Sequence, residues 1–127
     1  TVDSTCTGTI VFKMSALQDA HSEIPTHTNY NDKVCCTVSS GTLSNSCTSG
    51  VVVLHLSGDT DAHVEKNTQS NYPVNVCLSA DPGTVSCQYL NACNPDETCL
   101  AGLSADIDAH AADCNSPFTT KICCKIQ

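Results

Sequence analysis

The chain has little aromatic and little basic character. Its 127 residues include no tryptophan, and aromatic residues make up 4% of the sequence. Five lysine and arginine residues stand against thirteen aspartate and glutamate residues, which gives a formal net charge of −8. Nucleic acids and anionic membranes bind clustered basic residues. The charge balance therefore argues against both as partners.

Membrane and targeting signals are also missing. No apolar run approaches the roughly 20 residues that a spanning helix needs, and the longest, Val51–Leu56, has the length of a strand. There is no Asn-x-Ser/Thr sequon, so we do not expect N-glycosylation, although the many serines and threonines could carry O-linked sugars. The sequence starts at Thr1 without a charged and apolar leader, and we expect any signal peptide to have been removed.

Motifs of the common catalytic classes are absent as well. No serine lies in a Gly-x-Ser-x-Gly elbow, and no Cys-x-x-Cys pair occurs. Without such a constellation the sequence offers no assembled nucleophile or redox pair. We predict that the protein is not an enzyme and has no catalytic residues.

Cysteine, in contrast, is abundant. A small domain with few aromatic residues and many cysteines is typical of secreted proteins that are stabilised by disulfides. We therefore predict an extracellular or cell-surface protein. An odd number of cysteines leaves at least one thiol free or bonded to another chain. The eleven disulfide candidates are Cys6, Cys35, Cys36, Cys47, Cys77, Cys87, Cys93, Cys99, Cys114, Cys123 and Cys124.

Part of the pairing can be predicted from turns, because residues at equal distances from a hairpin turn face each other across two strands. The turns at Gly41 and Pro82 give two pairs, a short loop gives a third, and two inward-facing positions give a fourth. The expected pairs are Cys35–Cys47, Cys77–Cys87, Cys93–Cys99 and Cys36–Cys124. Cys6, Cys114 and Cys123 receive no assignment.

One motif occurs three times. The triplet Asp-Ala-His stands at 19–21, 61–63 and 108–110. In the first two copies it is followed, at identical spacing, by Glu, then Asn-Tyr, then Val-Cys. The third copy has Phe118 in place of the tyrosine and lacks the glutamate. An internal repeat of this kind indicates one supersecondary unit used three times.

The segments around each motif predict strands. Thr9–Met14 and Val51–Leu56 are short and β-branched, with a weaker echo at 100–104, and an alternating strand follows each motif. Turn signals at 39–41 and 81–83 precede two further short strands. These seven or eight strands predict a single all-β domain over residues 1–127. We expect a disulfide-rich β-sandwich of Ig-like or jelly-roll type, built from three strand–loop–strand repeats.

The three motif loops should lie at one end of such a domain, where their side chains could meet. Oxygen and imidazole groups at this density are potential metal ligands. The candidates are Asp19, His21, Glu23, Asp61, His63, Glu65, Asp108 and His110. We favour a structural interpretation, in which the aspartate caps a turn, the histidine bonds backbone carbonyls and the glutamate points to water. No cofactor is expected, with calcium as the one possibility.

The repeated unit resembles that of a known group of proteins. Asp-Ala-His-x-Glu, Asn-Tyr and Val-Cys, flanked by Leu-Ser as at 56–57 and 103–104, resembles an uncharacterised repeat of secreted bacterial proteins that is often written Asn-Ala-His-Val. Here aspartate replaces asparagine in every copy. Similar β-sandwich proteins are subunits of extracellular fibrils, in which one subunit's strand completes the next subunit's sheet. The resemblance implies an extracellular structural protein that self-associates into a fibre, pilus-like or surface homopolymer.

A donor strand can be proposed for this polymerisation. The segment from Thr1 to Met14 is the free extension, and the weak third repeat is expected to leave a short sheet edge that accepts it. The alternative function is an extracellular module that binds a glycan or calcium.

Overall fold

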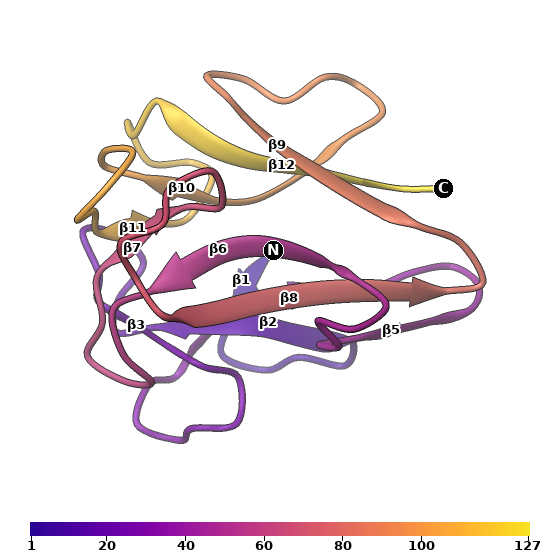
Figure 1. Ribbon diagram of the computed structural model, residues 1–127, viewed down its shortest axis with the longest axis horizontal. Coiled ribbons are helices and arrows are strands. Elements are labelled where there is room, and N and C mark those ends of the chain that lie inside the picture. The colour runs from indigo at the N-terminus through magenta and orange to yellow at the C-terminus, as the bar shows by residue number, and fades with distance from the viewer.

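The computed structural model describes all 127 residues, and it contains twelve β-strands and no helix. Figure 1 shows their course along the chain. The strands are β1 Val2–Asp3, β2 Thr9–Met14, β3 Ser22–Glu23, β4 Asp32–Cys36, β5 Thr42–Ser44, β6 Val51–Leu56, β7 Val64–Lys66, β8 Val74–Asp81, β9 Val85–Leu90, β10 Thr98–Leu103, β11 Ala111–Ala112 and β12 Thr120–Ile126. The all-β prediction is confirmed. The expected count of seven or eight was too low, because β1, β3, β7 and β11 have only two or three residues and show no alternation.

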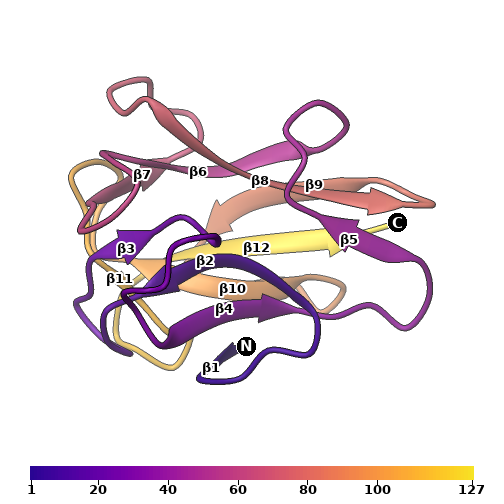
Figure 2. The same cartoon turned by 90° about the horizontal axis from the view of Figure 1, so that it is seen from below.

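Each repeat forms its own four-stranded antiparallel sheet. The orders are β1-β4-β2-β3, β5-β8-β6-β7 and β9-β12-β10-β11, so the same topology recurs three times. In every sheet the fourth and second strands of the repeat lie in the middle. The first strand forms the edge beside the fourth, and the third strand forms the edge beside the second. Figure 2 shows the three sheets around a shared interior. The predicted disulfide-rich fold of three repeats is therefore confirmed, with one sheet for each repeat.

The core is aliphatic and is built from equivalent positions. A cluster of 21 buried residues joins the sheets, and Phe12 is its one aromatic member. The register shifts on the second strand of every repeat, for example between Val52 and Leu54. A bulge of this kind lets neighbouring residues such as Val53 and Leu54 both face inward. This doubling of inward residues compensates for the shortage of large aromatic side chains.

Backbone pairing closes the three repeats into a ring. Ala62 pairs with Ser22 of the first repeat, Ala109 pairs with Val64 of the second, and Ala20 pairs with Ala111 of the third. Each pair exchanges two hydrogen bonds of 2.8 to 2.9 Å. The alanines of the three motifs are at most 1% exposed. A larger side chain would not fit at this junction, which explains why alanine stands in all three copies.

Five disulfides hold the molecule, so the prediction of at least four is confirmed. They are Cys6–Cys35, Cys47–Cys77, Cys87–Cys124, Cys93–Cys123 and Cys99–Cys114. Cys36 is free and buried, so its assignment to a disulfide was wrong. This dense bonding in a small domain indicates an oxidising environment.

All four predicted pairs were wrong, and one error explains the two that were derived from turns. They assumed that the chain folds back onto the same sheet after β4 and after β8. Instead it crosses to the next sheet, where β5 pairs with β8 and β9 pairs with β12. Cys87 therefore faces Cys124 across two paired strands, and Cys47 reaches Cys77.

The outer strands differ in how much of their neighbours they cover. In the third sheet β9 pairs with β12 from Lys121 to Ile126, and at the opposite edge β11 covers only Gly102 and Leu103 of β10. In the first sheet β1 pairs only with Lys33 and Val34, while Thr1 exchanges backbone hydrogen bonds with Cys35. Residues 37–40 make no backbone hydrogen bond to other backbone groups. In the second sheet β5 pairs with β8 only from Ser79 to Asp81, so the outer edges of β4 and β8 are both partly uncovered. No helix is present that could cross a membrane.

Candidate functional site

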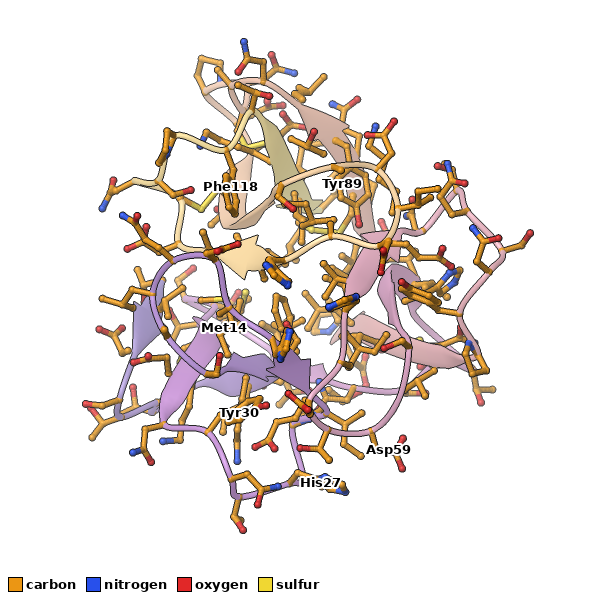
Figure 3. All side chains as sticks on the ribbon, turned by 90° about the vertical axis from the view of Figure 1, so that its left-hand side faces the viewer. Met14, His27, Tyr30, Asp59, Tyr89 and Phe118 are labelled. Carbon is orange, nitrogen blue, oxygen red and sulfur yellow. A yellow bond between two sulfur atoms is a disulfide. The ribbon has the colours of Figure 1, made fainter.

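Three histidines, one from each motif, meet where the repeats join. The ring centroids of His21, His63 and His110 lie 4.9 to 5.0 Å apart. One ring nitrogen of each histidine lies within 4.8 Å of a ring nitrogen of each of the other two. Their side chains are 33 to 37% exposed, so the cluster is open to solvent on one side. Figure 3 views the end of the molecule at which the three repeats meet around a common central axis. We call these residues the histidine cluster.

Local backbone geometry places each histidine. The preceding aspartates, Asp19, Asp61 and Asp108, have φ of 47 to 50°, a left-handed conformation that aspartate tolerates better than most residues. A serine at the end of β2, β6 or β10 then fixes the histidine backbone. In the second repeat Ser57 donates its N–H to the His63 carbonyl, and its Oγ accepts the His63 N–H. The Leu-Ser element of the sequence motif therefore positions the histidine.

Each histidine is held by an aspartate of the next repeat around the axis. Nδ1 of His21 lies 2.6 Å from Oδ1 of Asp61, His63 lies 2.5 Å from Asp108, and His110 lies 2.6 Å from Asp19. An ionised carboxylate can only accept, so Nδ1 carries the proton. In the neutral imidazole Nε2 then keeps its lone pair. The structural interpretation had histidine bonding backbone carbonyls, and this detail was wrong.

Two tyrosines support the aspartates. The hydroxyl of Tyr30 donates to Asp61 at 3.3 Å, and that of Tyr72 donates to Asp108 at 2.9 Å. Hydrogen bonds from His21 and His63, together with those from the tyrosines, lower the pKa of the two carboxyls. Burial and the Asp108 carboxylate raise the pKa of Tyr72 to about 12. The third repeat lacks this support, because Phe118 has no hydroxyl.

The glutamates of the motif lie away from the cluster. Glu23 and Glu65 are fully buried, so the prediction that they point to water was wrong. Glu65 accepts from both backbone and side chain of Asn71, from the Tyr72 backbone and from His55. Burial raises its pKa, but these donors outweigh that effect and hold it below the ordinary value. The carboxylates thus fix the Asn-Tyr loops that carry the tyrosines.

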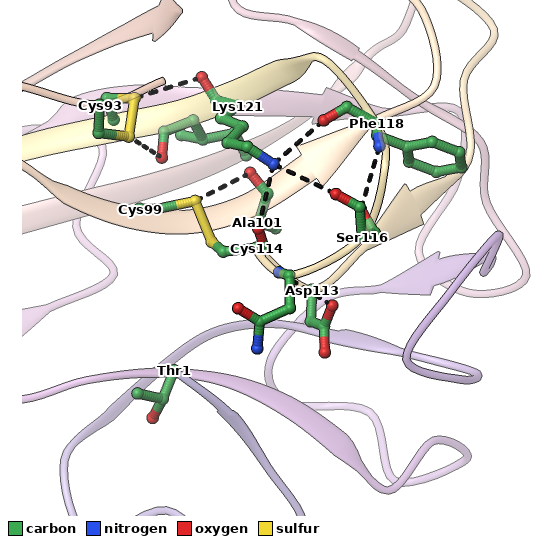
Figure 4. The surroundings of a disulfide bond; sticks show 12 residues. Thr1, Cys93, Cys99, Ala101, Asp113, Cys114, Ser116, Phe118 and Lys121 are labelled. Carbon is green, nitrogen blue, oxygen red and sulfur yellow. Dashed lines mark hydrogen bonds between the residues drawn. A yellow bond between two sulfur atoms is a disulfide. The ribbon is translucent and has the colours of Figure 1, made fainter. Parts of the chain in front are cut away.

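The third repeat holds the equivalent loop by other means. Ala112 occupies the position of the glutamate. Lys121 donates to the carbonyls of Cys114, Ser116 and Phe118, and the Cys99–Cys114 disulfide ties the same loop to β10. Figure 4 shows these contacts. The Lys121 ammonium group, which donates to carbonyls, thus takes the place of the glutamate carboxylate, which accepts from N–H groups in the other two repeats.

Of the eight candidate ligands, the structure thus brings three histidines together and places three aspartates behind them. Glu23 and Glu65 belong to separate buried networks. His27 and His55 lie outside the cluster, and His55 is half-buried against Glu65. The sequence did not lead us to predict that the histidine and the tyrosine of one repeat both bond the aspartate of the next repeat. The constant spacing from Asp-Ala-His to Asn-Tyr in the first two copies was the one visible signal.

A second feature lies beside the uncovered edge of β4. A cavity of about 560 Å³ is bounded by Thr1, by residues 35–40 and by the end of β12, with Leu78 and Leu100 among its apolar walls. Cys36 lines this cavity, and burial raises the pKa of its thiol. The equivalent residue in the third repeat, Cys124, is bonded to Cys87 of the neighbouring strand. The first repeat has no strand at that place.

Comparisons with protein-family models, with curated proteins and with solved structures found no match to this chain.

Proposed function

We propose that the protein is an extracellular structural subunit of a fibre, pilus-like or other surface assembly, whose copies join by exchanging the N-terminal strand. The position of β1 carries this proposal. It lies at the outer edge of its sheet and pairs through Val2 and Asp3 alone, and most of residues 1–8 are exposed. Val2 is the one residue of this segment that packs against the core cluster, so once the Cys6–Cys35 bond opens the segment can leave its sheet with little loss of buried surface.

The donor segment is limited by the next strand. β2 is an inner strand whose Phe12 and Met14 are fully buried, so its removal would expose much of the core. We therefore restrict the proposed donor to Thr1–Gly8, within the longer segment expected from the sequence. In a polymer these residues would pair with β4 of the next copy.

Disulfide chemistry would lock this exchange. Cys6 lies in the donor and Cys35 in the acceptor strand, and they are bonded within one chain in the structure. In the polymer the Cys6–Cys35 bond within each chain would break, and Cys6 would bond Cys35 of the next copy. This exchange leaves the number of disulfides unchanged and has to be started by an added catalytic thiol. A head-to-tail contact of this type gives a fibre when the rotation between successive copies does not close a ring.

The test combines microscopy with gels. Concentrated protein, incubated with a catalytic amount of reduced glutathione to start disulfide exchange, should form filaments in negative stain and a ladder of disulfide-linked species on a non-reducing gel. Deletion of Thr1–Gly8 should abolish both, and Cys6→Ser should abolish the ladder. Cys36→Ser is the matched control, because it removes the free thiol and should leave the ladder unchanged. A protein that stays monomeric at high concentration would contradict the proposal.

A binding module is the second candidate function. The observation that favours it is the convergence of three imidazoles at one exposed point, which is independent of the position of β1.

A further inference from the structure

The geometry points to a transition-metal site, and we propose that His21, His63 and His110 bind one divalent ion of the zinc or copper type through their Nε2 atoms. The inference goes beyond strand exchange and depends on neither β1 nor Cys6. It rests on the spacing of the rings, on their tautomer and on the groups behind them.

The spacing suits three bonds to one ion. Zinc binds imidazole nitrogen at about 2.0 to 2.1 Å, which in tetrahedral geometry puts the nitrogens about 3.3 Å apart. The nitrogens of the histidine cluster lie within 4.8 Å of one another. At this upper limit each ring has to move toward the axis by about 0.9 Å to reach bonding distance. Side chains that are a third exposed can make this movement without disturbing the core.

The tautomer is already the one that a metal requires. Because Nδ1 of each ring donates to an ionised aspartate, Nε2 is the free acceptor of the neutral ring. Carboxylates that hold ligating histidines in this way are a general feature of metal sites, where they orient the ring and raise its basicity. Here all three rings have such a carboxylate, and two of the carboxylates are held in turn by a tyrosine hydroxyl.

The backbone supports the same assignment. A left-handed conformation is uncommon outside glycine, and residues that keep it tend to be those whose side chain is needed. It occurs at three non-glycine positions, which are the three aspartates behind the cluster. Glycine would relieve the backbone there but would remove the carboxylate. The carboxylates also place three negative charges behind the rings, which favours a cation on the axis.

The donor set distinguishes between classes of ion. Imidazole suits zinc, copper and nickel, whereas calcium takes six to eight oxygen ligands. The Oδ1 atoms of the three aspartates are already engaged with the histidines. Three protein ligands leave a fourth position, which faces the solvent side of the cluster and would hold water or an exogenous anion.

The experiment titrates metal-free protein with Zn²⁺ by calorimetry and with Co²⁺ by visible absorption. One ion should bind per chain, Co²⁺ should give the intense absorption of a four-coordinate site, and the melting temperature should rise with metal concentration by mass action. Calcium should produce none of these changes. A chain that binds no Zn²⁺ at micromolar concentrations would overturn the proposal.

Variants locate the ion. His63→Ala should lower the affinity for Zn²⁺ by more than about 100-fold, whereas Asp108→Asn, which tolerates the same backbone conformation, should lower it about 10- to 100-fold. His27→Ala, outside the cluster, and Cys36→Ser, which removes the free thiol, should bind as the unaltered protein does. Retention of full affinity by a folded His63→Ala variant would show that the ion lies elsewhere. Filament formation by these variants reports separately on strand exchange.

Discussion

Replacing Glu65 tests whether a buried carboxylate holds the loop that supports the histidine cluster. Glu65 is fully buried and accepts hydrogen bonds of 2.8 to 3.2 Å from Asn71 Nδ2, His55 Nδ1 and the backbone N–H groups of Asn71 and Tyr72. Hydrogen bonds to a charged group contribute about 1.5 to 3 kcal/mol each, and unpaired buried donors cost about 1 to 3 kcal/mol. The contributions do not add fully, because the loop can relax toward water.

We expect Glu65→Ala to lower the free energy of unfolding by about 4 kcal/mol, since four donors lose their acceptor. Glu65→Gln keeps one carbonyl oxygen but turns an amide toward the remaining donors, and it should cost about 2 kcal/mol. Both effects are large against the 5 to 15 kcal/mol that is usual for a domain. Guanidinium unfolding with the disulfides intact measures them.

The control is Asp59→Asn, which also removes one negative charge but on an exposed side chain. It should change stability by less than about 0.5 kcal/mol. If Glu65→Ala costs no more than about 1 kcal/mol, the carboxylate network does not hold the loop. Hydrogen exchange at Tyr72 gives a second readout, because its N–H should lose protection in the Glu65 variants and keep it in the control.

Three other predictions concern packing, thiols and pH. A Cβ at Gly50 would lie 2.4 Å from the Leu78 carbonyl oxygen, whereas a Cβ at Gly58 would have its nearest neighbour 3.8 Å away. Gly50→Ala should therefore lower the free energy of unfolding by about 2 kcal/mol or more, and Gly58→Ala should change it by less than about 0.5 kcal/mol. Thermal or denaturant unfolding measures both. Alkylation of the unfolded, unreduced protein should add one label, at Cys36, by intact mass, and reduction should unfold the protein, since each bridge typically contributes about 2 to 5 kcal/mol; more than one labelled residue would contradict the five bridges. Burial raises the pKa of Tyr89 above its ordinary 10.0, so the folded state keeps this proton at a pH where the unfolded state has lost it. Stability should therefore fall as pH rises above about 10, and it should fall less steeply in Tyr89→Phe. Unfolding curves and tyrosinate absorbance as a function of pH measure this.

Local chemistry predicted the strands with long alternating patterns. β2 and β6 begin and end at the residues expected, because β-branched character and preceding glycines mark them. The turn signals before β5 and β9 were also correct. Local chemistry does not determine whether a strand after a turn stays in its own sheet or crosses to the next. That choice depends on how three sheets pack around one axis, and it determines which cysteines come close enough to form disulfides.

A comparison of repeats contained more information than the turns did. Cys35, Cys77 and Cys123 are equivalent, and each bonds a cysteine 29 or 30 residues earlier in the chain. This constant separation could have predicted three of the five bridges. The aspartate partners of the histidines could not be predicted in the same way, because each aspartate belongs to the following repeat. The sequence of a single copy does not determine the order in which the repeats are arranged around the axis.

The ring of alanine pairs has a consequence for how the chain folds. In an open array of repeats each unit contacts only its neighbours, so units can be added or removed and the ends can unfold alone. Here the first repeat is bonded to the third as well as to the second, through Ala20 and Ala111. No repeat has an outer end from which unfolding could begin. The molecule should therefore gain and lose its structure as a single cooperative unit.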